Sequence, residues 1–403
     1  MEKLYHIFNP WWENKYEFPG IPRDRYLAEM LNLKDRKDIV LITGLRRVGK
    51  TTIMRQLIFH LLKEVDPKRI FYISLDNIAL KDKSISEIVD TFRSINSLKQ
   101  TDFVYLFLDE VHFKDEFELQ LKNIYDIGKA KIFASGSSSL EIIMKTPYLT
   151  GRQRIIQISP LNFSEYLEFL NISVSSADTH LYPKLTEEYL ITGGMPEYVL
   201  TKDLNTLQSL VNSILYRDIA GRYEIRKKEN LLDILSLAAQ SVGSPISLRK
   251  ISKILDIPVE TINNILHLFL EAGLIYMVEK HGKVSERKLA PRKIYLADTG
   301  LFTILTENIN LGAIVENLVF LTLLQKGQIR YYRHSGYEID FITKDIAWEV
   351  KYKKLINESD LYNIKKIKGP KSRIMISFDT EQEIENIKCQ PLWKFLREHP
   401  NQT

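Results

Sequence analysis

A run of glycine, lysine and threonine in the first part of the chain has the composition and spacing of a phosphate-binding loop. Residues 44–51 read GLRRVGKT. Gly44 and Gly49 allow the backbone to wrap around an anion, and the N–H groups of such a loop attract negative charge. The Lys50 ammonium is placed to reach the β- and γ-phosphates of ATP, and the Thr51 hydroxyl is placed to ligate Mg²⁺. The residues expected to bind ATP or ADP are Gly44, Arg47, Val48, Gly49, Lys50, Thr51 and Thr52.

Two acidic residues end a second apolar run, FVYLFLDE at residues 103–110. Asp109 is expected to hold the Mg²⁺ shell. Glu110 is expected to orient and polarise the water that attacks the γ-phosphate. The alternative is a solvated acidic strand end, but this does not explain why the pair follows a phosphate loop.

Serine and arginine side chains further along the chain can also reach the phosphates. The run KIFAS at residues 131–135 continues into GSSS, so Ser135 and Ser137 are candidate sensors of the γ-phosphate. Helix capping by serine is the alternative. Arg152 can act as an arginine finger on ATP bound to a neighbouring subunit, which requires an oligomer. A surface salt bridge is the alternative for this arginine.

The run YEIDFITKDIAWEVKY, at residues 337–352, gathers acids and a lysine on one face of a predicted hairpin. Alternation in a strand directs every second side chain to the same face. With a two-residue turn in the middle of the run, Asp340 lies opposite Glu349, and Glu338 lies opposite Lys351. Carboxylates this close repel one another, so a cation such as Mg²⁺ is expected between them. The alternative is a charged face satisfied by its own ion pairs.

Five apolar runs, separated by helical patterns, are expected to form the framework that positions the first group of residues. Strands that alternate with helices predict a parallel sheet covered by helices on both faces, hence an α/β fold. The runs lie at residues 39–43, 69–75, 103–110, 131–135 and 154–159.

The middle of the chain is predicted to be helical. Residues 161–230 contain short amphipathic helices, and residues 231–297 have the pattern of a winged helix, in which residues 259–273 are the second helix of a helix-turn-helix. That second helix exposes no arginine or lysine, so DNA docking and packing against protein both remain open. The basic residues expected in the wing are Lys280, His281, Lys283, Arg287 and Lys288.

The order of these motifs resembles that of the AAA+-like P-loop ATPases of archaea and bacteria. Beyond the phosphate loop and the DE strand, the resemblance rests on GSSS (136–139), LTGR (149–152), PLNFSEY (160–166) and GGMPE (193–197). It covers nearly the whole chain, except about the first 22 residues with Trp11 and Trp12. It implies that residues 161–230 form a helical lid beside the nucleotide, followed by a C-terminal domain.

The C-terminal hairpin resembles the D…ExK pattern of the PD-(D/E)XK nucleases. Asp340, Glu349 and Lys351 match the pattern, and Glu316, in the apolar helix expected at residues 312–326, matches the helix-borne acid of those enzymes. The leading proline is absent, because Glu338-Ile339 precede Asp340. The resemblance implies a restriction-endonuclease-like α/β fold, which either cuts DNA or is catalytically silent.

The predicted organisation has five segments. They are a lead-in (1–37), the P-loop ATPase core (38–160), the helical lid (161–230), the winged helix (231–298) and the nuclease-like domain (299–403). The net charge of +5 permits an anionic partner, and the single cysteine, Cys389, excludes an intrachain disulfide. No apolar run is long enough to span a membrane, and the N-terminus does not resemble a signal peptide, so a cytoplasmic location is expected.

Two functional hypotheses follow from this organisation. In the first, ATP binding and Mg²⁺-dependent hydrolysis control a C-terminal region that binds or cuts double-stranded DNA. In the second, the chain is an ATP-dependent switch or scaffold that acts on a protein partner, and its nuclease-like fold is inactive.

Overall fold

The computed structural model describes residues 2–13, 16–136, 147–221, 228–308, 310–334 and 336–399. The chain divides into two units, residues 1–159 and 160–403. The first unit therefore ends close to the predicted end of the ATPase core. The segments predicted as lid, winged helix and nuclease-like domain all lie in the second.

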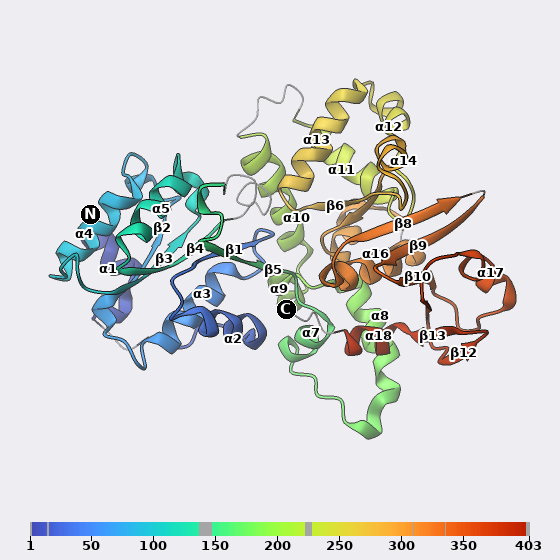
Figure 1. Ribbon diagram of the computed structural model, residues 1–403, viewed down its shortest axis with the longest axis horizontal. Coiled ribbons are helices and arrows are strands. Elements are labelled where there is room, and N and C mark those ends of the chain that lie inside the picture. Colours follow the sequence, from blue (N-terminus) through green and yellow to red (C-terminus); the bar gives the residue numbers. More distant parts are fainter. Residues whose placement is uncertain are drawn as a thin grey trace. The chain divides into compact units, whose positions relative to one another are not determined.

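A parallel sheet of five strands is the centre of the first unit (Figure 1). The strand order is β2-β3-β4-β1-β5, and all neighbouring strands run parallel. The α/β prediction is confirmed, because the five apolar runs became these five strands. Their bounds are β1 Ile39–Gly44, β2 Ile70–Ser74, β3 Val104–Asp109, β4 Ala130–Ser135 and β5 Gln153–Ile158.

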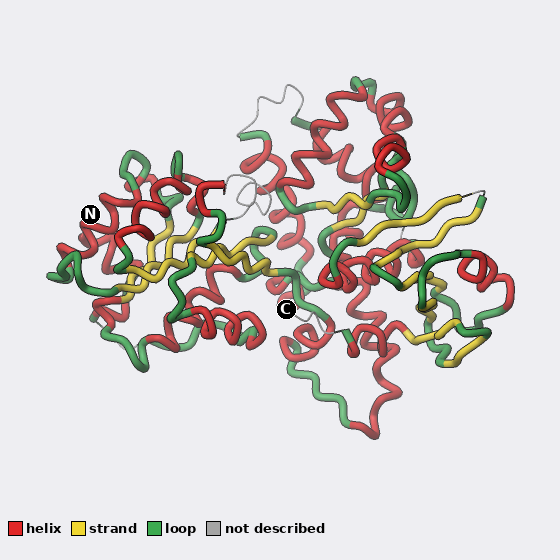
Figure 2. Tube along the Cα trace, in the orientation of Figure 1, coloured by secondary structure: helices red, strands yellow, loops and turns green. Residues whose placement is uncertain are grey.

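Helices cover both faces of this sheet, as Figures 1 and 2 show. On one face lie α2 (Asp24–Leu33) and α3 (Lys50–Leu61), which contact each other, and α3 contacts β1 and β4. On the other face, α1 (Glu2–Phe8), α4 (Ile85–Ile95) and α5 (Phe117–Ile127) share a core with the strands. Burial of both faces explains why the strands read as continuous apolar runs.

The N-terminal segment forms hydrogen bonds with the edge strand β2. Asn9 is fully buried; its Nδ2 donates to Tyr72 O (2.9 Å), and its Oδ1 accepts from Tyr72 N (2.7 Å). The indole N–H groups of Trp11 and Trp12 both donate to Ile70 O, at 3.1 and 3.0 Å. This lead-in, which lies outside the motifs noted in the sequence, is thus an integral part of the first unit.

The second unit begins with short helices that pack against its C-terminal end. The Tyr182 ring stacks on that of Trp393, with 5.4 Å between the centroids. The helices are α7 Phe163–Phe169, α8 Tyr182–Thr192, α9 Pro196–Thr201, α10 Leu204–Asn212 with a π-helical continuation Ser213–Ile219, and the C-terminal α18 Leu392–Glu398.

A three-helix segment with a two-stranded sheet follows. The connection between its two antiparallel strands, where the sequence predicts the wing, contains a helix, α14 (Val284–Leu289). The other elements are α11 Asn230–Gln240, α12 Leu248–Leu255, α13 Val259–Glu271, β6 Ile275–Val278 and β7 Lys293–Leu296.

The C-terminal part forms a mixed six-stranded sheet in the order β12-β13-β11-β10-β9-β8. The pairing of Thr343 with Ile346 gives the predicted two-residue turn between β9 and β10. The elements are α15 Phe302–Leu305, α16 Leu311–Leu323, β8 Ile329–His334, β9 Tyr337–Thr343, β10 Ile346–Lys351, α17 Glu358–Lys366, β11 Ser372–Ser377, β12 Gln382–Ile384 and β13 Ile387–Pro391. Cys389 is buried in the core of this part.

The glycines of the GGMPE motif lie in very close contact with two other segments of the second unit, at Leu161 and at Asp298. A Cβ on Gly193 would lie 2.1 Å from Asp298 Oδ1, and one on Gly194 would lie 2.2 Å from Leu161 O. The Asp298 carboxylate accepts from Gly194 N (2.6 Å) and from Gly300 N (2.9 Å). Only residues without a side chain fit this junction, so the glycine pair has a structural explanation.

Candidate functional site

The phosphate loop connects β1 to α3 in a conformation that requires its glycines. Gly44 has φ of 140°, and a Cβ there would meet Ile158 O at 2.2 Å. Gly49 has φ of 101° and directly precedes α3, while Arg47 also has a positive φ of 59°. The loop and the first turn of the helix provide the N–H groups that an anion needs.

Polar side chains from three strands and from α3 converge behind this loop. The Lys50 ammonium donates to the main-chain oxygens of Gly44 and Leu45, both at 3.0 Å. Asp109 Oδ2 accepts from the Thr51 hydroxyl at 2.6 Å. These two oxygen groups are ligands of the kind that Mg²⁺ prefers, so the residues fit a nucleotide-associated Mg²⁺.

Two further hydroxyl groups hold the Asp109 carboxylate. The buried Tyr72 donates to Oδ2 at 2.7 Å, and Ser135 donates to Oδ1. Burial, together with the neighbouring Asp109, raises the pKa of Tyr72, so the phenol stays protonated as a donor. Tyr72 carries no motif of its own and was not predicted; its place on β2, next to β3, brings it to Asp109.

Glu110 follows Asp109 in a left-handed conformation, with φ of 56°. Burial raises the pKa of Glu110 to about 7, with Asp109 adding to the increase and Lys50 opposing it. Its Oε2 lies 3.3 Å from His112 Nδ1. A carboxyl with a pKa near neutrality can take a proton from water at physiological pH.

The remaining residues predicted for this site have different surroundings. Ser137 lies outside the described residues. Arg152 is partly exposed, and its Nε is 3.9 Å from Asp126 Oδ1, which matches the salt-bridge alternative. Arg23, which the sequence did not indicate, donates from Nη1 to Val48 O at 3.1 Å and braces the phosphate loop.

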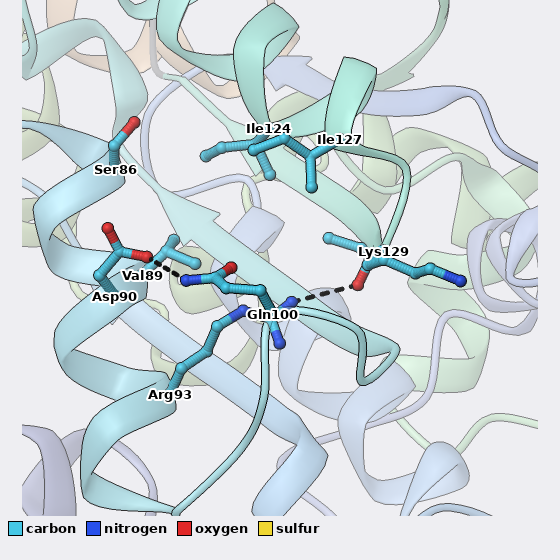
Figure 3. A pocket seen from close by; sticks show the side chains of 9 residues that line it. Ser86, Val89, Asp90, Arg93, Gln100, Ile124, Ile127 and Lys129 are labelled. Atoms are coloured by element: carbon cyan, nitrogen blue, oxygen red, sulfur yellow. Dashed lines mark hydrogen bonds between the residues drawn. The ribbon is translucent and has the colours of Figure 1, made fainter.

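A small pocket of about 80 Å³ lies elsewhere in the first unit (Figure 3). It is lined at Lys129 and Ala130, where β4 begins, whereas the phosphate loop follows the opposite end of the parallel strand β1. Two of its lining side chains form hydrogen bonds within the pocket: Arg93 Nη2 donates to Lys129 O (3.3 Å), and Gln100 Nε2 donates to Asp90 Oδ1 (2.9 Å). Because it lies at the opposite end of the sheet, this pocket is separate from the phosphate loop.

The carboxylates of the second unit also converge, but around a lysine, Lys293, that the sequence did not indicate. Lys293 Nζ, at the start of β7, lies 3.1 Å from Glu316 Oε1, 2.6 Å from Glu338 Oε1 and 3.8 Å from Asp340 Oδ1. Burial alone would lower the pKa of Lys293, but the surrounding carboxylates raise it above its usual value. Tyr295, on the same strand, donates to Glu316 Oε1 at 2.7 Å.

Lys351 and Glu349 form a second pair in this cluster. Lys351 Nζ lies 2.9 Å from Glu349 Oε1, and Asp340 Oδ2 accepts from Val350 N at 2.8 Å. Burial and then the neighbouring Asp340 raise the pKa of Glu349 to about 8, and the same causes raise that of Glu316 to about 7. Glu338 and Lys351, which the sequence predicts to lie opposite each other, each form an ion pair with a different residue of the cluster.

Comparison with known proteins assigns the first unit to a class. Residues 36–167 match the family described as an AAA domain, and residues 183–311 match one described as a domain of unknown function. With the five-stranded parallel sheet and the phosphate loop, this defines an AAA-type P-loop ATPase domain.

The chain belongs to the same protein family as the uncharacterized protein MJ1544 of Methanocaldococcus jannaschii. The two are 30% identical over 324 residues, which are 75% of this chain and 71% of MJ1544. An uncharacterized protein of Haemophilus influenzae is 25% identical over 389 residues, 91% of this chain and 96% of that protein. Among solved structures, the Walker-type ATPase PABY2304 of Pyrococcus abyssi is similar, with 14% identity, a TM-score of 0.44, and coverage of 73% of this chain and 99% of that one.

Among the described residues, no helix is long and apolar enough to cross a membrane.

Proposed function

We propose that the chain hydrolyses ATP with Mg²⁺ at the phosphate loop, and that its nucleotide state controls a DNA-binding or DNA-cleaving region in residues 231–403. The observation that carries the first part is the contact between Thr51 Oγ1 and Asp109 Oδ2 (2.6 Å), directly beside Glu110 with its raised pKa. A metal-ligating pair next to a base of near-neutral pKa is the arrangement that phosphoryl transfer to water needs.

Each residue has a distinct role in the proposed reaction. Lys50 leaves its carbonyl acceptors to hold the β- and γ-phosphates, and the main-chain N–H groups of the loop bind the same anion. Glu110 orients the attacking water and accepts its proton as the bond to the γ-phosphorus forms and the bond to the β-phosphate oxygen breaks. Thr51 and Asp109 would hold Mg²⁺, which would neutralise charge on the phosphates.

Turnover measurements test this proposal. ATP hydrolysis with Mg²⁺ is measured with and without double-stranded DNA for wild type, Lys50→Ala and Glu110→Gln. Lys63→Ala and Glu64→Gln are matched controls, since both side chains are exposed at the end of α3 distant from the loop. We expect a loss of at least about 100-fold in kcat for the two site variants and none for the controls. Equal turnover in Glu110→Gln and wild type would reject Glu110 as the base.

Exposed basic residues beside α14 support the DNA-binding part. Lys283 and Lys288 are exposed there, and Lys280 is half-buried nearby. Such residues contact phosphates and read little sequence. Double-stranded DNA affinity is therefore expected to fall steeply with salt. The Lys283→Ala/Lys288→Ala variant should lose about two units of that slope, while Lys63→Ala/Lys68→Ala should not. Equal slopes in both variants would remove α14 from the DNA interface.

Arg152 is proposed to act on ATP bound to a neighbouring subunit. Its ion pair with Asp126 is long and partly exposed, so the guanidinium can be released at low cost. Mixing inactive Arg152→Ala with inactive Lys50→Ala should restore part of the turnover, because mixed neighbours combine an intact loop with an intact arginine. Arg154→Ala, which removes a similar exposed pair with Asp38, is the control and should retain full turnover alone.

The second candidate is an ATP-dependent switch that acts on a protein partner and contains a silent nuclease-like fold. The contacts of Lys293 with three carboxylates favour it, since an ammonium lies where a cleaving enzyme would need a divalent ion. DNA-independent turnover together with uncut DNA would support this candidate over the first.

A further inference from the structure

The carboxylate cluster of the second unit is assembled from three separate elements. Glu316 comes from α16, Glu338 and Asp340 come from β9, and Glu349 comes from β10. Those carboxylates that are ionised in this largely buried region need positive charge close by, since an uncompensated buried charge is very unfavourable. The question is which cation supplies it.

Lys293 is built into this cluster from β7. Its side chain has no exposed surface, and its ammonium lies 2.6 Å from Glu338 Oε1 and 3.1 Å from Glu316 Oε1. Asp340 Oδ1, at 3.8 Å, is close enough for an ion pair but not for a hydrogen bond. The ring of the buried Tyr331 covers it, with Nζ 5.6 Å from the ring centroid. Tyr295, two residues along and on the same strand face, adds a hydroxyl donor to Glu316. The strand thus presents a cation and a hydroxyl to the acids together.

The remaining oxygens do not fit a resident divalent ion. In the part of the chain that the structure describes, no group of three or more His, Cys, Asp or Glu side chains is arranged to hold a metal. One oxygen of Asp340 accepts from Val350 N, and one oxygen of Glu349, Oε1, is paired with Lys351. Magnesium and manganese demand several oxygens at about 2.0–2.2 Å around one point, and Lys293 Nζ holds that point.

We propose that Lys293 is the resident cation of this cluster in place of a divalent metal, and that it joins β7 to α16 and β9. This inference deepens the second candidate function, the silent nuclease-like fold. The cluster then stabilises the packing of β7 against α16 and β9 within the second unit. Its carboxylates are available to a metal only when the Lys293 ammonium is removed.

The experiment measures Mn²⁺ binding to the full chain by electron paramagnetic resonance, without nucleotide. Binding that depends on Asp340 is isolated by comparing each protein with the same protein carrying Asp340→Asn, which leaves the phosphate loop intact. Wild type, Lys293→Ala and Lys351→Ala are compared. The last is the matched control, because it removes the same charge from a lysine that contacts Glu349 alone among the cluster acids.

We expect no Asp340-dependent Mn²⁺ in wild type, about one such ion per chain in Lys293→Ala, and none in Lys351→Ala. Asp340-dependent Mn²⁺ in wild type overturns the proposal. So does its absence in a folded Lys293→Ala chain, as judged by circular dichroism. If that chain does not fold, Lys293→Gln takes its place, and the wild-type pair still decides whether a metal is resident. None of these readouts uses ATP, so failure of the proposed ATPase is seen separately.

Discussion

The junction between Gly194 and Leu161 gives a prediction whose sign depends on the local packing alone. A Cβ on Gly194 would lie 2.2 Å from Leu161 O and 2.7 Å from Leu161 N. Leu161 N also donates to Gly194 O at 2.7 Å, so the two backbones cannot separate without breaking this bond. Gly194→Ala therefore combines overpacking, about 1–3 kcal/mol, with a buried N–H left unpaired, about 1–3 kcal/mol. The expected loss in free energy of unfolding is about 2–6 kcal/mol.

Gly312→Ala is the matched substitution in the same unit. Gly312 lies in the first turn of α16, and its added Cβ would approach Asn310 Oδ1 no closer than 3.4 Å. Alanine is favoured over glycine in a helix by about 0.5–1 kcal/mol, so this variant should be unchanged or slightly more stable.

Urea unfolding of the full chain measures both variants. Because the chain has two units, two transitions are expected, and the one that ATP does not shift is assigned to the second unit. A Gly194→Ala chain whose transition matches that of Gly312→Ala would refute the packing argument, because the two substitutions add the same methyl group.

Three further predictions concern the first unit. Asn9→Ala leaves the buried N–H and C=O of Tyr72 without their partners, so the free energy of unfolding in the ATP-sensitive transition should fall by about 2–6 kcal/mol. The control is Asn96→Ala, at a half-buried residue, which should lower it by less than about 1 kcal/mol. Tyr72→Phe should lower kcat by about tenfold with little change in the KM for ATP, because it frees the Asp109 carboxylate; a change confined to KM would contradict this role. Because the pKa of Glu110 is raised to about 7, its carboxylate becomes protonated and can no longer act as a base as the pH drops from about 8 to about 6. The value of kcat/KM should fall over this range, and a flat pH profile would exclude Glu110 as the base.

The strands and loop of the ATPase domain were predictable from the sequence because their signals are local. The runs that became β1 and β3 are apolar except at their carboxyl ends, since both faces of the sheet are covered. Gly44 and Gly49 mark a turn whose backbone conformation other residues rarely adopt. Each signal is contained within a few neighbouring residues. The same holds for the two-residue turn between β9 and β10.

Residues whose partners lie far away in the chain were not predictable in this way. Lys293 reads as the polar start of a strand beside a basic segment, and its burial depends on Glu316, 23 residues further on. Asn9 reads as an ordinary loop residue, and its role depends on Tyr72, 63 residues away. Composition and periodicity do not encode such contacts, so nothing in the sequence indicated that Lys293 lies among these carboxylates.

The hydrogen bonds between the N-terminal segment and the edge strand β2 also affect the association of one chain with another. A strand at the edge of a sheet exposes main-chain N–H and C=O groups that can template a strand from a second molecule, which is a common route to aggregation. Here the side chains of Asn9, Trp11 and Trp12 occupy three such groups, on Ile70 and Tyr72. Expressing only the part that matches the AAA domain, from residue 36, would uncover this edge. Such a fragment would be a poor surrogate for the intact chain in solubility and assembly studies.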